Sequence, residues 1–142
     1  MDIITPEKRS FIMSLVHGKD TKPEIIVRKY LFSKGLRFRK NDRRLPGCPD
    51  IVFPKYKTVI FVNGCFWHGH EGCKGAIMPK SNVEYWQNKI HANIERDKTI
   101  RNQLSCLGWV TITVWECELK AKTRDDTLSK LYCKVTMSNQ SP

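Results

Sequence analysis

The sequence has no long hydrophobic run, no internal repeat and no low-complexity tract. Its apolar stretches all fall short of the roughly 20 residues that a membrane-spanning helix needs, and its first residues do not form an apolar leader segment. We therefore expect a cytoplasmic protein. With 142 residues, 40% of them hydrophobic, the chain has the size of one domain with a single core.

Acidic residues are scarce in this chain. Asp and Glu number 14 against 25 Lys and Arg, which gives a formal net charge of +11. Such an excess favours encounters with polyanions, of which nucleic acid is the common one. On composition alone, a membrane-surface patch and a merely soluble surface are the alternatives.

Six cysteines in a chain without a secretion signal favour free thiols or metal ligation over disulfides, because the cytoplasm is reducing. Four residues separate Cys65 from His70 and two separate His70 from Cys73, so these side chains can share a metal ion. Cys117, which follows a predicted strand, would complete a closed tetrahedral zinc site of three thiolates and one imidazole.

Other ligand sets fit the same spacing. His68 can replace His70, and Cys106 or Cys48 can replace Cys117. Buried free thiols that bind no metal are a further alternative.

The hydrophobic pattern predicts a mixed α/β domain in which helices cover a central sheet. The second helix opens at Thr21 in a capping-box pattern with Glu24 and closes at Gly35. In chain order we expect helices at 5–16 and 21–35, strands at 36–39, 50–53 and 57–62, a helix at 82–107, a strand at 109–115 and a last helix from 123. We treat 1–142 as one domain, with an N-terminal helix and arm at 1–20, a core at 21–119 and a C-terminal helix and tail at 120–142.

Asp50 stands at the start of a predicted strand. If the chain returns through a tight turn at 54–56, antiparallel pairing sets Asp50 opposite Phe61 or Val62. The carboxylate then lies beside the end of the next strand, where a second ligand can complete a magnesium site, because Mg²⁺ needs only one or two carboxylates besides water and phosphate. The alternative is an Asp that serves the turn before a strand.

An apolar face runs along the predicted long helix and consists of Val83, Trp86, Ile90, Ile94 and Leu104. Asp97 falls at the centre of this face, where an unpaired carboxylate costs on the order of several kcal/mol. His68 is a suitable partner, since a carboxylate bound to one ring nitrogen orients the imidazole for proton transfer by the other. An ordinary structural hydrogen bond would explain Asp97 equally well.

Phe66 and Trp67 stand between the proposed metal ligands, in a segment too short to bury both easily. Aromatic side chains that are held rigidly can wedge between base pairs. Packing into the local core is the alternative.

Four motifs in one order carry a resemblance to a known family: LPGCPD at 45–50, GCFWHGHEGC at 64–73, NIERD at 93–97 and VWEC at 114–117. From about Lys8 to Leu119 the sequence resembles the very-short-patch-repair (Vsr) DNA mismatch endonucleases. The resemblance implies a restriction-endonuclease-like (PD-(D/E)XK-type) fold. It also implies nicking of double-stranded DNA 5′ to the T of a T:G mismatch, the product of 5-methylcytosine deamination, which initiates very short patch repair.

The resemblance further implies a role for each candidate residue. Asp50 would bind Mg²⁺ together with the main-chain carbonyl of Val62. His68 would transfer a proton, with Asp97 as its orienting partner. Glu24 would lie near the metal-bound waters, although its place in the capping box is an adequate explanation of that residue.

By the same resemblance, the structural zinc ligands are Cys65, His70, Cys73 and Cys117. The aromatic wedge beside the mismatch consists of Phe66, Trp67 and Trp86. Met13 matches a residue that is inserted from the opposite groove. We expect a monomer that binds no membrane and that associates with the nucleoid when it is bound to DNA.

Two positions depart from the family pattern, because Val62 and Asn63 stand where members often carry Thr and His. The family uses a main-chain carbonyl at the first position, so Val62 can still serve as a metal ligand. We expect the missing His at Asn63 to alter the rate or the contact with the scissile phosphate.

Two other functions compete with this one. A zinc-stabilised DNA-binding module without catalysis explains the charge and the cysteines, but it leaves Asp50 and the inward-facing Asp97 without a task. A restriction or recombination nuclease of the same fold would cut paired DNA without needing a mismatch. Mg²⁺-dependent nicking, compared on T:G and T:A duplexes, separates the three.

Overall fold

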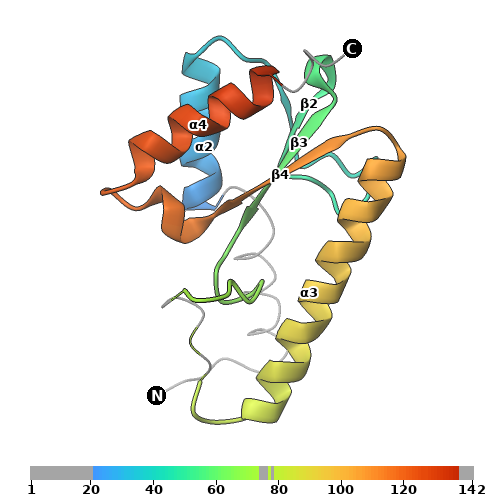
Figure 1. The fold of residues 1–142 in the computed structure, drawn as a ribbon, viewed down its shortest axis with the longest axis vertical. Helices are drawn as coiled ribbons and strands as arrows, with labels where there is room; N and C mark the ends of the chain where they lie inside the picture. The colour runs from blue at the N-terminus through green and yellow to red at the C-terminus, as the bar shows by residue number, and fades with distance from the viewer. Residues whose placement is uncertain (1–20, 74–76, 78, 138–142) are drawn as a thin grey trace, which may run out of the picture.

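The computed structural model describes residues 21–73, 77 and 79–137. The helix that the sequence predicts at 5–16, and with it Met13, lies outside the described residues. Within them the chain forms one four-stranded sheet flanked by helices on both sides (Figure 1). The mixed α/β class that the sequence predicts is therefore confirmed.

The sheet consists of β1 (Arg39–Lys40), β2 (Ile51–Phe53), β3 (Thr58–Asn63) and β4 (Val110–Trp115), in that spatial order. β2 pairs antiparallel with both β1 and β3, whereas β3 and β4 pair in parallel. The parallel pair needs a long crossover connection, and the segment between Asn63 and Val110 supplies it. The sheet therefore contains both antiparallel and parallel strand pairs.

The first strand was predicted too early in the chain. The sequence places it at 36–39, but β1 is Arg39–Lys40. Leu36 instead ends the preceding helix, because its N–H donates to the carbonyl of Leu31 at 3.1 Å and its side chain is buried in the core. The apolar character of this segment therefore comes from closing a helix and not from strand pairing.

The β2–β3 connection fixes where Asp50 lies. The 3₁₀ helix η1 (Pro54–Tyr56) makes the turn, and Lys57 takes a left-handed conformation with φ 51°. Ile51 pairs with Ile60. Asp50, one residue earlier, is then carried to the end of β3 beside Phe61 and Val62, as the sequence predicts.

Three helices flank the sheet: α2 (Lys22–Ser33), α3 (Val83–Cys106) and α4 (Arg124–Met137). α2 begins as predicted, because the Thr21 hydroxyl accepts from the N–H of Glu24 at 3.5 Å. It ends just before Gly35, whose φ of 90° favours glycine. α3 and α4 also lie where the sequence predicts them.

Each face of the sheet has its own core, and Figure 1 shows α2 and α4 on one side and α3 on the other. Alternate strand residues supply the two cores because successive side chains point to opposite faces. The larger core is formed by Val27, Leu31, Ile51, Phe53, Ile60, Val114, Leu128, Leu131 and Val135, among others. The smaller core under α3 is formed by Val52, Val59 and Leu104, with Phe61, Ile100 and Trp109 packed against it.

The apolar face of α3 is shorter than the sequence predicts. Val83 is 39% exposed, and of the face only Ile90 and Leu104 are buried. A helix of 24 residues is about 36 Å long, whereas a six-residue strand spans about 20 Å. The first turns of α3 therefore extend past the sheet (Figure 1) and have no sheet to pack on.

Candidate active site and metal centre

The segment 64–73 follows β3 directly and carries the two histidines of the site. Backbone bonds wind it tightly, with His68 N–H donating to Gly64 O at 3.2 Å and His70 N–H to Cys65 O at 2.9 Å. Gly69, between the histidines, has φ 59°, and a Cβ there would lie 2.7 Å from the Ile94 side chain. Only glycine fits this close approach of the segment to α3. The turn sends His68 toward α3, and His70 toward the chain that follows β4.

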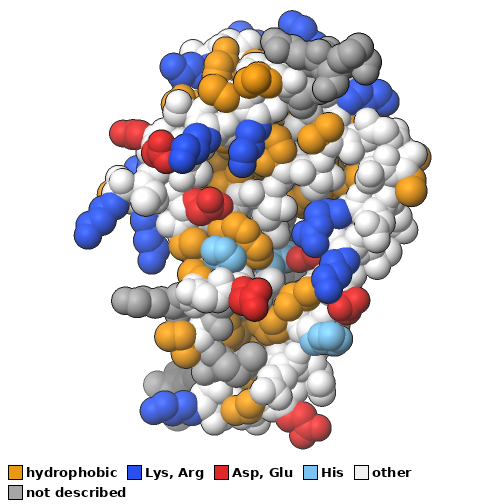
Figure 2. All heavy atoms as spheres, viewed as in Figure 1, with side chains coloured by type: hydrophobic (Ala, Val, Ile, Leu, Met, Phe, Trp, Pro, Cys, Tyr) orange, Lys and Arg blue, Asp and Glu red, His pale blue; other side chains and the backbone are white. Residues whose placement is uncertain are grey.

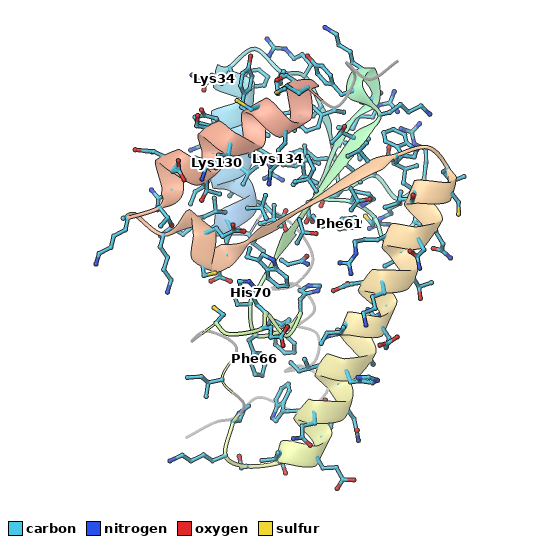
Figure 3. All side chains as sticks on the ribbon, in the orientation of Figure 1. Lys34, Phe61, Phe66, His70, Lys130 and Lys134 are labelled. Carbon is cyan, nitrogen blue, oxygen red and sulfur yellow. The ribbon has the colours of Figure 1, made fainter. Side chains whose placement is uncertain are left out.

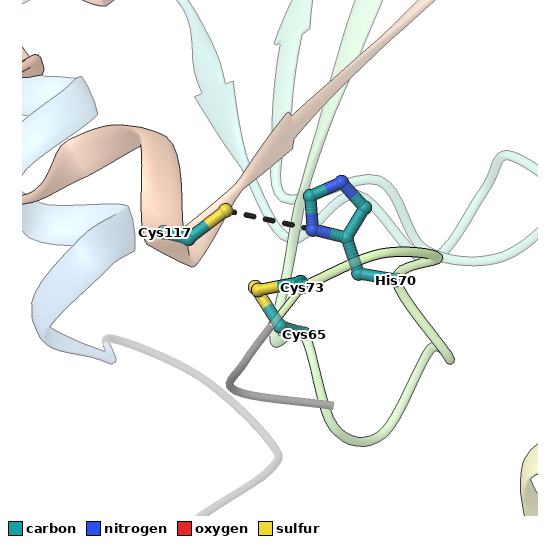
Figure 4. Close-up of side chains that lie close together, drawn as sticks. All are labelled: Cys65, His70, Cys73 and Cys117. Carbon is teal, nitrogen blue, oxygen red and sulfur yellow. Dashed lines mark hydrogen bonds between the residues drawn. The ribbon is translucent and has the colours of Figure 1, made fainter. Parts of the chain in front are cut away.

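The four predicted metal ligands converge (Figure 4). One ligand atom from each of Cys65, His70, Cys73 and Cys117 lies within 4.8 Å of all the others. Cys117 belongs to the 3₁₀ helix η3 (Glu116–Leu119), and its Sγ lies 3.5 Å from Nδ1 of His70. Three sulfurs and one imidazole nitrogen at this spacing can hold a metal ion.

Burial of this cluster affects its protonation. Burial raises the pKa of the Cys65 thiol to about 12, and it also raises the pKa of Cys117. Without a cation these sulfurs therefore hold their protons at neutral pH, whereas a bound metal ion favours the thiolates. The alternative ligands lie elsewhere, since His68 contacts α3 and Cys106 is exposed at the end of that helix.

Trp115 supports the cluster in a way that the sequence did not reveal. Its indole stacks on the imidazole of His70, with ring centroids 4.0 Å apart and planes 6° from parallel. The position of Trp115 two residues before Cys117 was visible, but its partner depends on how the segment 64–73 folds back on β4. The stack fixes the orientation of His70.

Asp50 is the candidate metal-binding carboxylate. Its Oδ2 accepts from the N–H of Val62 at 2.6 Å, so β3 holds the carboxylate in place. Burial raises the pKa of Asp50 to about 7, against the effect of the Val62 N–H, and the neighbouring Glu24 raises it further. Two carboxylates close enough to disfavour each other's charge form an oxygen-rich site that suits a divalent cation.

The loop before Asp50 is held by its own contacts. Both carboxylate oxygens of Asp42 bind the Arg44 guanidinium, at 3.0 and 2.9 Å, and these hydrogen bonds lower the pKa of Asp42 to about 2. The N–H of Asn41 donates to the carbonyl of Asp50 at 3.0 Å. The loop therefore delivers Asp50 to a defined position at the start of β2.

Arg28 belongs to this site and was missed in the sequence. Glu24 and Arg28 are both buried on the inner side of α2, and their charged groups lie 3.6 Å apart. Arg28 acts on Asp50 as well, because its charge opposes the rise in the pKa of that carboxyl. The sequence pattern that could have revealed Arg28 was its i, i+4 spacing from Glu24, on the side of the helix that carries the core residues Val27 and Leu31.

His68 and Asp97 meet as the sequence predicts. Nδ1 of His68 lies 2.6 Å from Oδ2 of Asp97 on α3. Because a carboxylate accepts, Nδ1 carries the proton in this pair and Nε2 is left to act as an acceptor. The Asn93 amide donates to the Trp67 carbonyl at 2.8 Å and ties the same segment to α3.

Phe66, Trp67 and Trp86 form one aromatic cluster. Their ring centroids lie 5.2, 5.3 and 5.7 Å apart in edge-to-face pairs. All three are only half-buried, and none belongs to either core of the sheet. Figure 3 places Phe66 on the far side of His70 from β4, beside the first turns of α3.

Basic side chains surround this region. On the face shown in Figure 2, histidine side chains lie near the centre, with Lys and Arg side chains over α4 on one side and along α3 on the other. This arrangement suits a polyanion that crosses the site. None of the helices formed by the described residues is long and apolar enough to cross a membrane.

Comparison with known proteins gives one consistent result. The family model described as "DNA mismatch endonuclease Vsr" matches residues 1–74. "Type II nicking enzyme V.NmeAIP" of Neisseria meningitidis is 56% identical, over 85% of this chain and 86% of the relative. "Type II nicking enzyme V.XorIIP" of Xanthomonas oryzae is 49% identical, over 83% and 86%. "DNA mismatch endonuclease Vsr" of Escherichia coli is 38% identical, over 91% and 83%.

The likenesses to these relatives cover most of both chains, and they agree with the resemblance that the four sequence motifs carry. Vsr proteins are DNA-cleaving hydrolases of the restriction-endonuclease-like class, which agrees with the mixed sheet and the carboxylate at the start of β2. The chain belongs to the Vsr family of DNA mismatch endonucleases.

Proposed function

We propose that this endonuclease nicks double-stranded DNA 5′ to the T of a T:G mismatch left by deamination of 5-methylcytosine, and so initiates very short patch repair. The observation that supports this most directly is the pairing of His68 with Asp97 at 2.6 Å, beside the strand end that holds Asp50. A carboxylate and an oriented imidazole at one strand end are what metal-assisted hydrolysis of a phosphodiester requires.

Mg²⁺ is the cation that suits the first half of this site. Asp50 and the nearby Glu24 offer hard oxygen donors, and the main-chain carbonyl of Val62 is the further ligand that we propose. When bound, Mg²⁺ stabilises the charge that develops on the phosphate and lowers the pKa of its bound water. Asp50 binds the cation, and Glu24 acts near its waters.

His68 is the residue that we propose for proton transfer during hydrolysis. Asp97 holds Nδ1, so the ring keeps one orientation and one tautomer. Nε2 can then take a proton from the attacking water or return one to the leaving oxygen. Asp97 is a positioning residue, since it acts through His68.

Zn²⁺ is the ion that best suits the cluster of Cys65, His70, Cys73 and Cys117. Four protein ligands leave no open position, so we assign this site a structural role. It ties the segment 64–73 to η3 and thereby fixes both the His68 imidazole and the aromatic cluster.

The aromatic cluster is the part that we propose to sense the mismatch. T:G pairs keep hydrogen bonds but stack and deform differently from regular pairs, so a rigid wedge enters more easily there. Phe66, Trp67 and Trp86 are half-buried and buttress one another, which suits that task. We propose Met13 as the residue inserted from the other groove.

A nicking assay tests the proposal. A T:G duplex and its T:A counterpart, each labelled on either strand, are incubated with the protein and Mg²⁺ or with chelator. We expect cleavage of the T strand of the T:G duplex only, 5′ to the T, and none with chelator or with Asp50→Asn. Cleavage on the other strand, or without a divalent cation, would contradict the proposal.

A second candidate is nicking of paired DNA by a nuclease of the same fold. It is favoured by the names of the Neisseria and Xanthomonas relatives, which are called type II nicking enzymes with no mention of a mismatch. Equal rates on the T:G and T:A duplexes would support this candidate. Binding of both duplexes with no cleavage under any divalent cation would support a non-catalytic module.

A further inference from the structure

A small hollow lies beside Asp97, between α3 and the end of the parallel strand pair. Its lining consists of Phe61, Asn63, Asp97, Ile100, Arg101 and Thr113, and its volume is about 10 Å³. Phe61, one of its walls, lies between β4 and α3 (Figure 3). The hollow has room for about one water molecule, so a larger group can only sit at its mouth.

Two uncharged polar side chains line the hollow beside Asp97. One is Asn63, which is only 6% exposed. The other is Thr113, which pairs across the sheet with Phe61. An amide and a hydroxyl can each donate and accept hydrogen bonds, so this wall is suited to a polar guest.

Arg101 stands at the mouth of the same hollow. It lies four residues after Asp97, so both side chains project from the same side of α3. Other arginines here have partners, since Arg44 binds Asp42 and Arg96 contacts Asn93. Arg101 is exposed and makes no ion pair within the described part of the chain. Its guanidinium therefore offers a positive charge beside the Asp97 carboxylate, whose own charge repels phosphate.

We propose that Arg101 is a phosphate-binding residue of the nuclease site. Its guanidinium binds a phosphate of the cleaved strand next to the nicked bond. Guanidinium suits this task because its forked N–H groups match two phosphate oxygens. Asn63 and Thr113 bind the same phosphate, directly or through the one water that fits the hollow. The inference rests on the proposed function in so far as DNA must enter between α3 and the end of β3.

The test compares three proteins for DNA binding, each in the Asp50→Asn background so that no strand is cut. They are the parent, Arg101→Gln, and Lys55→Gln as a control that loses the same charge from η1, at the opposite end of the sheet. We expect Arg101→Gln to bind about tenfold more weakly, the size of one charged hydrogen-bond pair. Its log–log salt dependence should be less steep by about 0.9. The control should change much less.

Neutral methylphosphonate groups, placed one at a time along the cleaved strand, locate the contact. One position beside the nick should weaken binding by the parent but have no effect on Arg101→Gln, because the two changes remove the same contact. Independent effects at every position, or a loss equal to that of Lys55→Gln, would overturn the inference. A lower melting temperature with an unchanged methylphosphonate pattern would make Arg101 a structural partner of Asp97, which also overturns it.

This test is separate from that of the proposed function. It measures binding and not cleavage, so it can succeed even if the cation or the mismatch preference has been assigned wrongly. If the chain nicks T:G duplexes as proposed while Arg101→Gln behaves like Lys55→Gln, only the inference about Arg101 fails.

Discussion

Two regions of this protein begin at the same strand end and differ in almost every chemical respect. On one side of the segment 64–73, Cys65, His70, Cys73 and Cys117 form a compact cluster of soft donors. On the other side, Asp50, His68 and Asp97 supply harder oxygen and nitrogen atoms, held by the Val62 N–H and by the His68–Asp97 pair. The first region closes on itself, and the second stays open.

The difference shows how one short segment serves two purposes. His68 and His70 are two residues apart, yet His68 is held by a carboxylate on α3 and His70 by Trp115 and Cys117. Soft thiolates suit Zn²⁺ and oxygen donors suit Mg²⁺, so we propose that each region binds its own ion. The predictions below test that separation.

The largest effect should come from Asp50. We expect Asp50→Asn to lower the nicking rate by at least about a thousandfold, because the neutral amide is a poor ligand for Mg²⁺. Zinc content and melting temperature should stay at wild-type values. Single-turnover nicking and metal analysis measure both, with Asp125→Asn, an exposed carboxylate at the start of α4, as the control. Loss of zinc in Asp50→Asn would contradict the claim that the two regions act separately.

Substitution of a ligand in the cysteine–histidine cluster should instead remove the zinc and lower the stability of the fold. Cys117→Ser should lose the bound zinc and destabilise the fold by several kcal/mol, since a structural metal site contributes folding free energy directly. Cys133→Ser, at an exposed position on α4, should change neither property. Thermal unfolding followed together with zinc release makes the comparison. A zinc-free wild type of full stability would remove the claim of a structural zinc site.

His68, the residue that we propose for proton transfer, should affect the rate of cleavage and leave the affinity for DNA unchanged. We expect His68→Ala to lower the single-turnover rate by about 10²-fold or more, the usual contribution of general acid–base catalysis, with little change in the Kd for T:G DNA. His91→Ala, an exposed histidine of α3, is the matched control. If His68→Ala weakened binding as much as it slowed cleavage, His68 would be a DNA contact and not a catalyst.

The smallest effect should be seen at the aromatic cluster. Trp67→Ala should weaken binding to T:G DNA by about 1–3 kcal/mol, the scale of one lost base–aromatic stack. Binding to fully paired DNA depends on Lys and Arg contacts with phosphates, so it should change much less and remain strongly salt-dependent. Both affinities are measured at one fixed salt concentration. Equal losses on the two duplexes would mean that Trp67 supports the fold and does not sense the lesion.

Local sequence signals predicted much of this structure. The Thr21 cap, the long helix and the alternation of β4 depend on neighbouring residues, and all lie as predicted. The convergence of Cys117 with the segment 64–73 was a long-range prediction. Spacing alone left Cys106 and Cys48 open as the fourth ligand, and the resemblance to the Vsr family selected Cys117.

What the sequence did not reveal depends on tertiary contacts. Leu36 looked like part of a strand but closes a helix, and Val83 looked buried but extends past the sheet. The stacking of Trp115 on His70 and the pairing of Arg28 with Glu24 arise only once separate elements are brought together. The periodicity of a helix indicates which of its faces is apolar, but it does not indicate how far the sheet that covers this face extends.

The most direct test of the two-region account is the zinc content of His68→Ala and His70→Ala, purified side by side with the wild type. The two substitutions are the same and lie two residues apart, so any difference between them reflects which region each histidine serves. The account predicts about one tightly held zinc per chain for the wild type and for His68→Ala, and a loss of zinc in His70→Ala. Zinc retained by His70→Ala and lost from His68→Ala would contradict it.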